Sequence, residues 1–172
     1  MSDKIYNVLF LCTGNSARSI LAESIINKWG KGRFRGFSAG SHPTGRVNPL
    51  ALGLLKQLDF PTEGLRSKSW DEFSGLQAVH FDFIITVCDN AAGETCPVWP
   101  GHPMTAHWGI PDPAGVEGTE MGKKMAFSDA FNAIERRIKL FLRLPMAGID
   151  QIRMKQQMDA IGQSAAPADD AP

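Results

Sequence analysis

Leu11-Cys12-Thr13-Gly14-Asn15-Ser16-Ala17-Arg18-Ser19 is the stretch around which the rest of the sequence is organised. An apolar run over residues 5–10 precedes it and predicts a buried strand, and apolar residues at helical spacing over 20–26 follow it. A cysteine, five loop residues and an arginine therefore lie at a strand-to-helix turn. Gly14 and Asn15 tolerate a positive φ, so this loop can curl and turn its N–H groups inward. With the first turn of the helix, these groups predict an oxyanion cradle.

Two side chains of this loop predict covalent chemistry. N–H groups that hold an oxyanion also stabilise a thiolate, so we expect the pKa of Cys12 to be lowered. Arg18 offers a planar fork of donors to two oxygens of a tetrahedral anion. The pattern thus predicts a cysteine nucleophile attacking an oxyanion that is bound by Thr13, Gly14, Asn15, Ser16, Ala17, Arg18 and Ser19. The alternative is that Cys12 is a buried apolar residue closing a strand.

The composition is that of an ordinary globular protein. A chain of 172 residues suits one domain, and 43 % apolar with 21 % charged residues is typical of soluble proteins. Lysine plus arginine equals aspartate plus glutamate at 18 each, which gives no basic excess for nucleic acid or a membrane surface. Three cysteines do not make a disulfide scaffold, and no apolar run has membrane-spanning or signal-peptide character. We expect a cytoplasmic protein with reduced thiols.

Strands and helices alternate along the chain. Further strands are expected at residues 33–38, 81–88 and 104–108. Asn48-Pro49 is a good helix opening; the apolar face of that helix is Leu50, Leu54, Leu55 and Leu58. A later helix has an apolar face of Phe127, Phe131, Ile134, Ile138 and Phe141, with Glu135, Arg136, Arg137 and Lys139 mostly opposite. Such alternation predicts an α/β fold with a four-stranded parallel sheet and ligands at the carboxyl ends of the strands.

The chain is expected to divide near Leu144-Pro145. Residues 1–145 form the folded catalytic domain, and residues 146–172 form a C-terminal extension. Ile149, Ile152 and Met158 support a short amphipathic helix at the start of this extension, and its end is small, polar and expected to be disordered.

Cys88 and Cys96 form a second candidate site on one polar, glycine-bearing loop. Cys88 follows a strand, as Cys12 does, so both thiols are expected at the same sheet edge. A redox relay would then be possible: Cys88 attacks the sulfur of Cys12, and Cys96 resolves that disulfide. Two alternatives remain, a zinc site with His102 and His107, whose spacing is open for a structural zinc site, and two unrelated free thiols.

Asp112 is the third candidate. Asp112-Pro113 is a turn signal, so a purely structural aspartate is at least as well supported. Because Asp112 follows the last expected strand, it could also reach the anion and protonate a leaving oxygen as general acid.

The loop from Cys12 to Ser19 resembles the signature loop of the low-molecular-weight tyrosine phosphatase fold, which includes phosphatases and a branch of arsenate reductases. Cys88…Cys96-Pro97, followed by His107-Trp108-Gly109 and Asp112-Pro113-Ala114-Gly115, is similar to the thioredoxin-coupled arsenate reductases. The phosphatase branch commonly has a second cysteine where this chain has Ala17, and tyrosines after its Asp-Pro pair; here the one tyrosine is Tyr6.

The resemblance implies a three-layer, flavodoxin-like fold and the reduction of arsenate to arsenite. It implies roles for Cys12 as nucleophile, Arg18 and Ser19 in the anion loop, Asp112 as general acid, and Cys88 and Cys96 as relay thiols. No tightly bound cofactor and no metal are expected. The electron source would be an external dithiol protein, thioredoxin, or glutaredoxin with glutathione. A phosphatase that hydrolyses phosphate monoesters, and a non-catalytic anion-binding or redox-sensing domain, are the alternatives.

Some reductases of this family hold potassium near the loop through an asparagine, a glutamate, a serine and an aspartate. Asn15, Glu23 and Ser38 match the first three, and Lys68 lies where the aspartate would be. We therefore hypothesise that the Lys68 ammonium replaces the ion.

Overall fold

The computed structural model describes residues 4–73, 79–88, 103–146 and 148–163. At its centre is a four-stranded parallel sheet in the order β2-β1-β3-β4. Its strands are β1 (Tyr6–Leu11), β2 (Phe34–Ala39), β3 (Phe83–Thr86) and β4 (Met104–His107). The register pairs Leu11 with Ala39 on one side and with Thr86 on the other, so three strands end at one edge. The predicted α/β fold with a four-stranded parallel sheet is confirmed.

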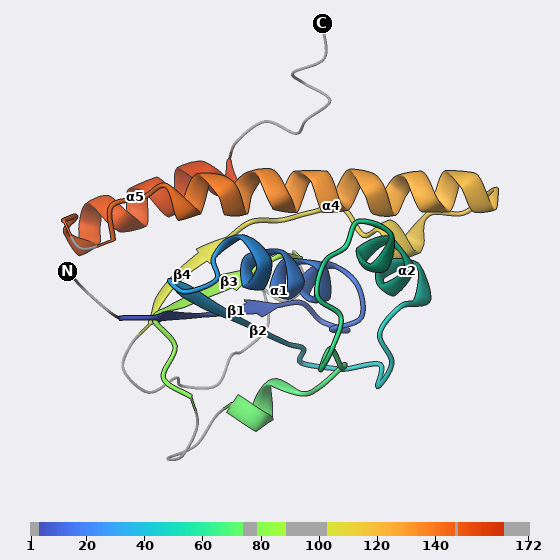
Figure 1. Ribbon diagram of the computed structural model, residues 1–172, viewed down its shortest axis with the longest axis horizontal. Coiled ribbons are helices and arrows are strands. Elements are labelled where there is room, and N and C mark those ends of the chain that lie inside the picture. Colours follow the sequence, from blue (N-terminus) through green and yellow to red (C-terminus); the bar gives the residue numbers. More distant parts are fainter. Residues whose placement is uncertain (1–3, 74–78, 89–102, 147, 164–172) are drawn as a thin grey trace, which may run out of the picture.

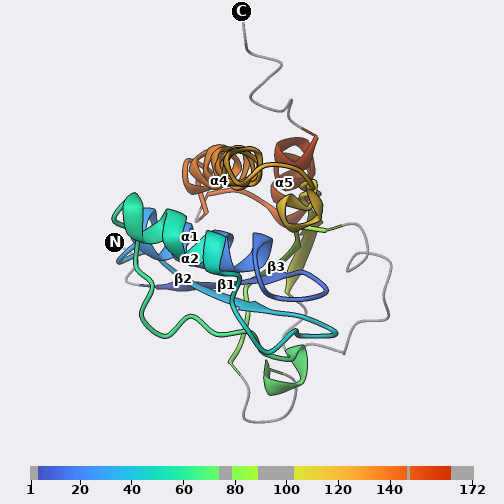
Figure 2. The same cartoon turned by 90° about the vertical axis from the view of Figure 1, so that its right-hand side faces the viewer.

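The described α-helices gather over one face of the sheet, as Figures 1 and 2 show. They are α1 (Arg18–Trp29), α2 (Pro49–Gln57), α4 (Glu120–Leu142) and α5 (Gln151–Gly162). Two short 3-10 helices, η1 (Trp70–Phe73) and η2 (Pro113–Gly115), complete the described elements. Asn48 caps α2 as expected, since its side chain accepts a hydrogen bond from the Leu50 N–H at 2.9 Å.

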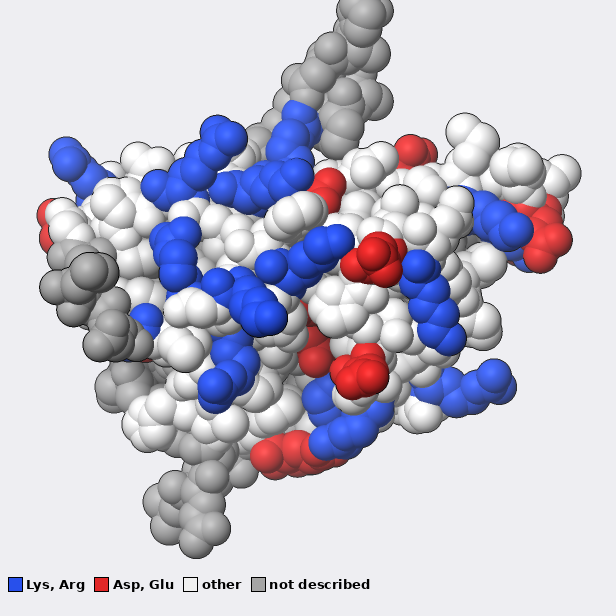
Figure 3. All heavy atoms as spheres, viewed as in Figure 1, with Lys and Arg blue, Asp and Glu red and all other residues white. Residues whose placement is uncertain are grey.

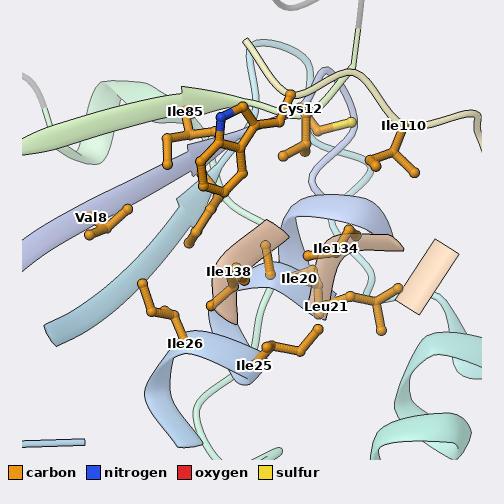
Figure 4. Close-up of a cluster of buried hydrophobic side chains, with 14 of the residues drawn as sticks. Val8, Cys12, Ile20, Leu21, Ile25, Ile26, Ile85, Ile110, Ile134 and Ile138 are labelled. Carbon is orange, nitrogen blue, oxygen red and sulfur yellow. The ribbon is translucent and has the colours of Figure 1, made fainter. Parts of the chain in front are cut away.

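The main core lies between the sheet and this helix layer. Val8 and Ile85 point from the strands toward Ile20 and Ile25 of α1 and toward Ile134 and Ile138 of α4 (Figure 4), and Phe10 belongs to the same cluster. A smaller cluster covers the opposite face and joins residues of the strands to Trp70 of η1; its buried members are Leu9, Leu11, Ala39, Trp70, Phe81 and Ile84. Both faces of the sheet are therefore buried, as its continuous apolar strands predict.

Helix α5 packs against β4 and belongs to the main core. Met154, Met158 and Ile161 are its buried residues, and the Trp108 indole N–H donates to the Met158 carbonyl at 2.9 Å. The end of α5 approaches the backbone of His107 so closely that position 162 requires glycine, because a Cβ there would lie 2.4 Å from the His107 carbonyl oxygen. The helix predicted after the catalytic domain exists, but it shares the core of that domain.

Three predictions about buried faces are wrong. Leu58 is exposed because α2 ends before it and Leu58 is its C-cap. Ile152 is 75 % exposed, since α5 turns the face bearing Met154 and Met158 inward. Arg137, expected on the polar face of α4, is 9 % exposed and lies among the buried residues of that helix.

The surface carries charges of both signs. On the face in Figure 3, acidic side chains are interspersed among the basic ones, in keeping with the equal totals of 18. No helix within the described residues has the length and apolar character needed to cross a bilayer.

Candidate active site

Cys12 directly follows β1 and belongs to the main core cluster, where it is 5 % exposed (Figure 4). Its backbone N–H donates to the Ala39 carbonyl at 3.2 Å, which extends the pairing of β1 with β2 by one residue. The residues after Cys12 then leave the sheet and enter the loop that ends at α1. The predicted strand–loop–helix arrangement is confirmed.

The carbonyl groups of this loop are hydrogen-bonded to segments outside it. Thr13, Gly14 and Ser16 each accept a backbone hydrogen bond at 2.8 to 3.0 Å; the donors are His42, Thr44 and Asn48. The Ser67 hydroxyl also donates to the Gly14 carbonyl, at 3.1 Å. The loop is therefore held from its outer side by residues 42–48 and 67.

The N–H groups of residues 14–17 donate to no acceptor in the described part of the chain. Asn15 has a φ of 46°, so one of the two residues expected to reach positive φ does so, while Gly14 does not. Successive N–H groups without acceptors, followed by the start of α1, form a site suited to an oxyanion.

The side chains of Asn15 and Ser19, two residues of the predicted anion loop, form hydrogen bonds within the protein. The Asn15 amide donates to the Ser19 hydroxyl at 2.8 Å and accepts from the Lys68 N–H at 2.9 Å. Asn15 and Ser19 are fully buried. Their side chains therefore help to set the shape of the loop, and the backbone N–H of Asn15 remains one of those without an acceptor in the described residues. Gly40 matters here as well, because a Cβ at position 40 would lie 2.4 Å from the Thr13 carbonyl oxygen.

Cys88 lies beside this loop. Its sulfur accepts a hydrogen bond from the Thr13 N–H at 3.3 Å, and Cys88 is 2 % exposed. The expectation that the two thiols share one sheet edge is therefore confirmed for Cys12 and Cys88, which follow the neighbouring strands β1 and β3. Cys96 lies outside the described residues.

The predicted lowering of the Cys12 pKa is wrong for this arrangement. A hydrogen bond with the Cys88 thiol and then burial raise the pKa of Cys12, while Arg18 and the Thr13 N–H act in the opposite direction. The loop does provide the stabilising groups that the sequence indicates. Their effect is outweighed because the Cys88 side chain and the buried surroundings of Cys12 both disfavour its thiolate.

Arg18 and Asp112 lie close together where the loop ends at the start of α1. The Arg18 guanidinium donates to the Ile110 carbonyl at 2.9 Å, and its other terminal nitrogen lies 3.7 Å from an Asp112 carboxylate oxygen. The second oxygen of Asp112 accepts from the Ala114 N–H at 3.0 Å and caps η2. Asp112 therefore has the structural role of a turn residue and also stands next to the predicted anion-binding arginine.

A buried ion pair lies behind the loop. Lys68 Nζ is 3.8 Å from a Glu23 carboxylate oxygen, and the same oxygen accepts a hydrogen bond from the Ser38 hydroxyl. Burial lowers the pKa of Lys68 and raises the pKa of Glu23, and each group opposes the shift of the other. The Lys68 ammonium thus lies beside Glu23, which also binds Ser38, and the potassium hypothesis groups both residues with Lys68.

The zinc alternative is tested only in part. No group of three His, Cys, Asp or Glu side chains suited to a metal ion occurs within the described ranges. His107 instead hydrogen-bonds the Thr86 hydroxyl at 2.7 Å. Cys96 and His102 lie outside those ranges.

Gly40 and Ser67 are not among the site residues that the sequence indicates, and Arg137 is expected on the polar face of its helix. Gly40 and Ser67 hold the loop through contacts between distant segments, and no local pattern predicts such contacts. The position of Arg137 did carry a signal: residues 130, 134, 137 and 141 follow the spacing of a buried helical stripe. The charge of Arg137 outweighed that spacing in the prediction.

A profile of the family described as "Low molecular weight phosphotyrosine protein phosphatase" matches residues 7–157. An arsenate reductase from Oceanobacillus iheyensis is 37 % identical over 148 residues, which cover 83 % of this chain and 98 % of that protein.

Solved structures of two proteins share the fold. The crystal structure of an arsenate reductase from Archaeoglobus fulgidus has a TM-score of 0.57 at 28 % identity, covering 77 % of this chain and 98 % of the other. A low molecular weight protein tyrosine phosphatase from T. tengcongensis has a TM-score of 0.59 at 21 % identity, covering 78 % and 98 %. The matched residues run from β1 into α5, and so include the cysteine loop with Arg18, and also Cys88 and Asp112. The chain belongs to the low molecular weight phosphotyrosine protein phosphatase family.

Proposed function

We propose that this protein reduces arsenate to arsenite with a relay of three cysteines. The observation that carries the proposal is the meeting of Cys12 and Cys88 at a loop whose N–H groups suit an oxyanion. A phosphatase needs only the first of these thiols, whereas a reductase needs two electrons from a thiol pair. The identity to an arsenate reductase, 37 % over most of the chain, supports the same function.

The first step is attack on arsenic. Arsenate binds to the N–H groups of residues 13–19 and to the Arg18 guanidinium. The Cys12 thiolate forms a sulfur–arsenic bond, and one oxygen leaves as water after accepting a proton from Asp112. Because the Thr13 N–H donates to Cys88 here, we expect the Cys88 side chain to move from it as the anion binds.

The second step is reduction. The Cys88 thiolate attacks the Cys12 sulfur and forms a disulfide, and the electron pair of the broken sulfur–arsenic bond reduces arsenic to the trivalent state. Cys96 then attacks Cys88, which releases Cys12 as a thiolate and leaves a Cys88–Cys96 disulfide. A dithiol protein reduces this disulfide in the cytoplasm, and thioredoxin fits an intramolecular disulfide better than glutaredoxin with glutathione does.

The test is arsenate-dependent NADPH oxidation with thioredoxin and thioredoxin reductase. The native protein is compared with Cys12→Ser, Cys88→Ser and Cys96→Ser. Turnover by the native protein and its loss in all three variants is the expected result. A second assay replaces thioredoxin with glutaredoxin and glutathione, and turnover confined to that assay would assign the other reductant.

Phosphate-ester hydrolysis distinguishes the phosphatase alternative. Hydrolysis without arsenate turnover, unchanged in Cys88→Ser and Cys96→Ser, would mean that water rather than Cys88 attacks the Cys12 adduct. Binding of arsenate without repeated turnover in either assay would indicate an anion sensor.

A further inference from the structure

Arg137 is a buried cation that takes no part in the reaction steps proposed above. It lies on α4, is 9 % exposed, and has no acidic partner among the described residues. Its guanidinium donates to one carbonyl group, that of Gly109, at 3.0 Å. Burying a guanidinium costs free energy unless strong interactions compensate for it. The hydrogen bond to the Gly109 carbonyl is the polar interaction that Arg137 makes within the described residues.

Gly109 begins the segment that carries Asp112. On one side of Gly109 the Trp108 N–H donates to the Thr86 carbonyl at 2.7 Å, and on the other the Ile110 N–H donates to the Val87 carbonyl at 3.0 Å. The N–H groups thus tie this segment to the end of β3. Its carbonyl groups are held by two arginines, Gly109 by Arg137 and Ile110 by Arg18.

Only Pro111 separates Ile110 from Asp112, and Pro113 follows. Prolines restrict the backbone on both sides of the aspartate, so the position of Asp112 depends closely on where residues 109 and 110 are held.

Side-chain packing leaves this segment partly open toward α4. A cavity of about 570 Å³ lies between the two, with Asp112, Pro113 and Val116 on one wall and Asp129, Ala130 and Ala133 on the other. The segment is held there by the packing of Ile110 in the main core and of η2 against α4, and by the hydrogen bond from Arg137 of α4 to the Gly109 carbonyl at its start.

We infer that Arg137 is a positioning residue for the proposed reaction, which holds Gly109 so that the Asp112 carboxyl stays beside Arg18 and the bound anion. The inference rests on the proposed general-acid role of Asp112. Arg137 acts through the backbone and does not touch the anion itself. Small displacements of a catalytic group are costly, and a shift of about 1 Å can slow a reaction a hundredfold.

The test is a double-mutant cycle on arsenate reduction. Arg137→Met keeps much of the aliphatic stem but removes the donors, and it is measured in the native and the Asp112→Asn backgrounds. In the native background we expect kcat to fall about tenfold or more, with a much smaller change in KM. In the Asp112→Asn background we expect no further loss, because the group that Arg137 positions is already disabled.

Two further variants make the cycle decisive. Arg137→Lys keeps a cationic donor and should lose less kcat, again only in the native background; it carries the same test if Arg137→Met fails to fold. Ile138→Ala disturbs the neighbouring core position on α4 and should lower Tm with the same effect on kcat in both backgrounds.

Equal loss of kcat from Arg137→Met in both backgrounds would overturn the positioning role and leave arsenate reduction intact. Absence of arsenate turnover by the native protein would overturn the proposed function, and this inference with it.

Discussion

The Cys88 sulfur accepts a hydrogen bond from the Thr13 backbone N–H, 3.3 Å away. Thr13 is the first residue of the loop after Cys12, so the sulfur of Cys88 occupies a donor that the loop could otherwise offer to an anion. The same side chain is the largest cause of the raised pKa of Cys12. In this arrangement Cys88 therefore favours the protonated form of Cys12, the residue proposed as nucleophile.

Replacing Cys88 should activate Cys12. In Cys88→Ala the largest cause of the raised pKa is removed, while Arg18 and the Thr13 N–H continue to lower it. The folded-state pKa of Cys12 should fall, so a larger fraction is thiolate at pH 7 and alkylation is faster, by about tenfold for each unit by which the pKa falls.

The measurement is the pH dependence of iodoacetamide labelling of Cys12, followed by mass spectrometry in a Cys96→Ala background. Cys88→Ser serves as the matched control, because its hydroxyl keeps a hydrogen-bonding group beside Cys12, and it should show a smaller shift. A labelling curve for Cys88→Ala that moves to higher pH would contradict the prediction.

Removing Lys68 should make stability depend on pH through Glu23. Burial raises the pKa of Glu23, and the charge of Lys68 is the largest influence that lowers it. Lys68→Met should therefore raise the pKa of Glu23 further. The folded state then retains a proton that the unfolded state releases, and the contribution to stability is present below the unfolded pKa and lost as pH rises through the folded pKa.

We expect Lys68→Met to lose about 3–5 kcal/mol of unfolding free energy at pH 8, and clearly less at pH 5, by urea denaturation. The control is Lys68→Met combined with Glu23→Gln, which keeps an acceptor for Ser38 and should remove the added pH dependence. A loss of the same size at both pH values would show that Glu23 is not the group responsible.

Potassium should have no special effect on this protein. Lys68 Nζ already provides a positive charge 3.8 Å from Glu23. Exchanging sodium chloride for potassium chloride at equal concentration should leave both Tm and arsenate turnover unchanged. A substantial rise of either in potassium would refute the hypothesis that the ammonium replaces an ion.

Helix α5 should contribute to the stability of the whole fold. Met158 is fully buried and its carbonyl binds Trp108, whereas Ile152 on the same helix is 75 % exposed. Met158→Ala should cost about 2–5 kcal/mol of unfolding free energy, and Ile152→Ala less than about 0.5 kcal/mol, by chemical denaturation. Similar costs for the two would mean that α5 is held less firmly than its contacts indicate.

The cysteine loop and the strand-end positions of Cys12 and Cys88 could be predicted, because they depend on contiguous sequence. The run from β1 through Cys12 to α1 is contiguous, and hydrophobic spacing places Cys12 and Cys88 at strand ends. The contact of Cys88 with Thr13 joins residues 75 positions apart, and the pKa of Cys12 depends on that contact. A local pattern contains the groups that would stabilise a thiolate but not the neighbour that outweighs them.

Side chains that face the interior of the site were predicted less well. The sequence assigns Asn15 to the anion loop but does not reveal that its side-chain amide bridges Ser19 and the Lys68 N–H. Arg137 was placed on the polar face because arginine is usually exposed. In both cases the outcome depends on the partner that the fold supplies, which residue type alone does not reveal.

The outer hydrogen bonds of the cysteine loop limit how it can be reused in protein engineering. Its carbonyl groups are held by the N–H groups of residues 42–48 and by Ser67, and Gly40 leaves room for the Thr13 carbonyl. Grafting residues 12–19 alone between a strand and a helix of another scaffold would therefore transfer the reactive groups without the support that shapes them. A functional transplant has to include three separate pieces of chain: the loop, residues 39–48, and residues 67–68.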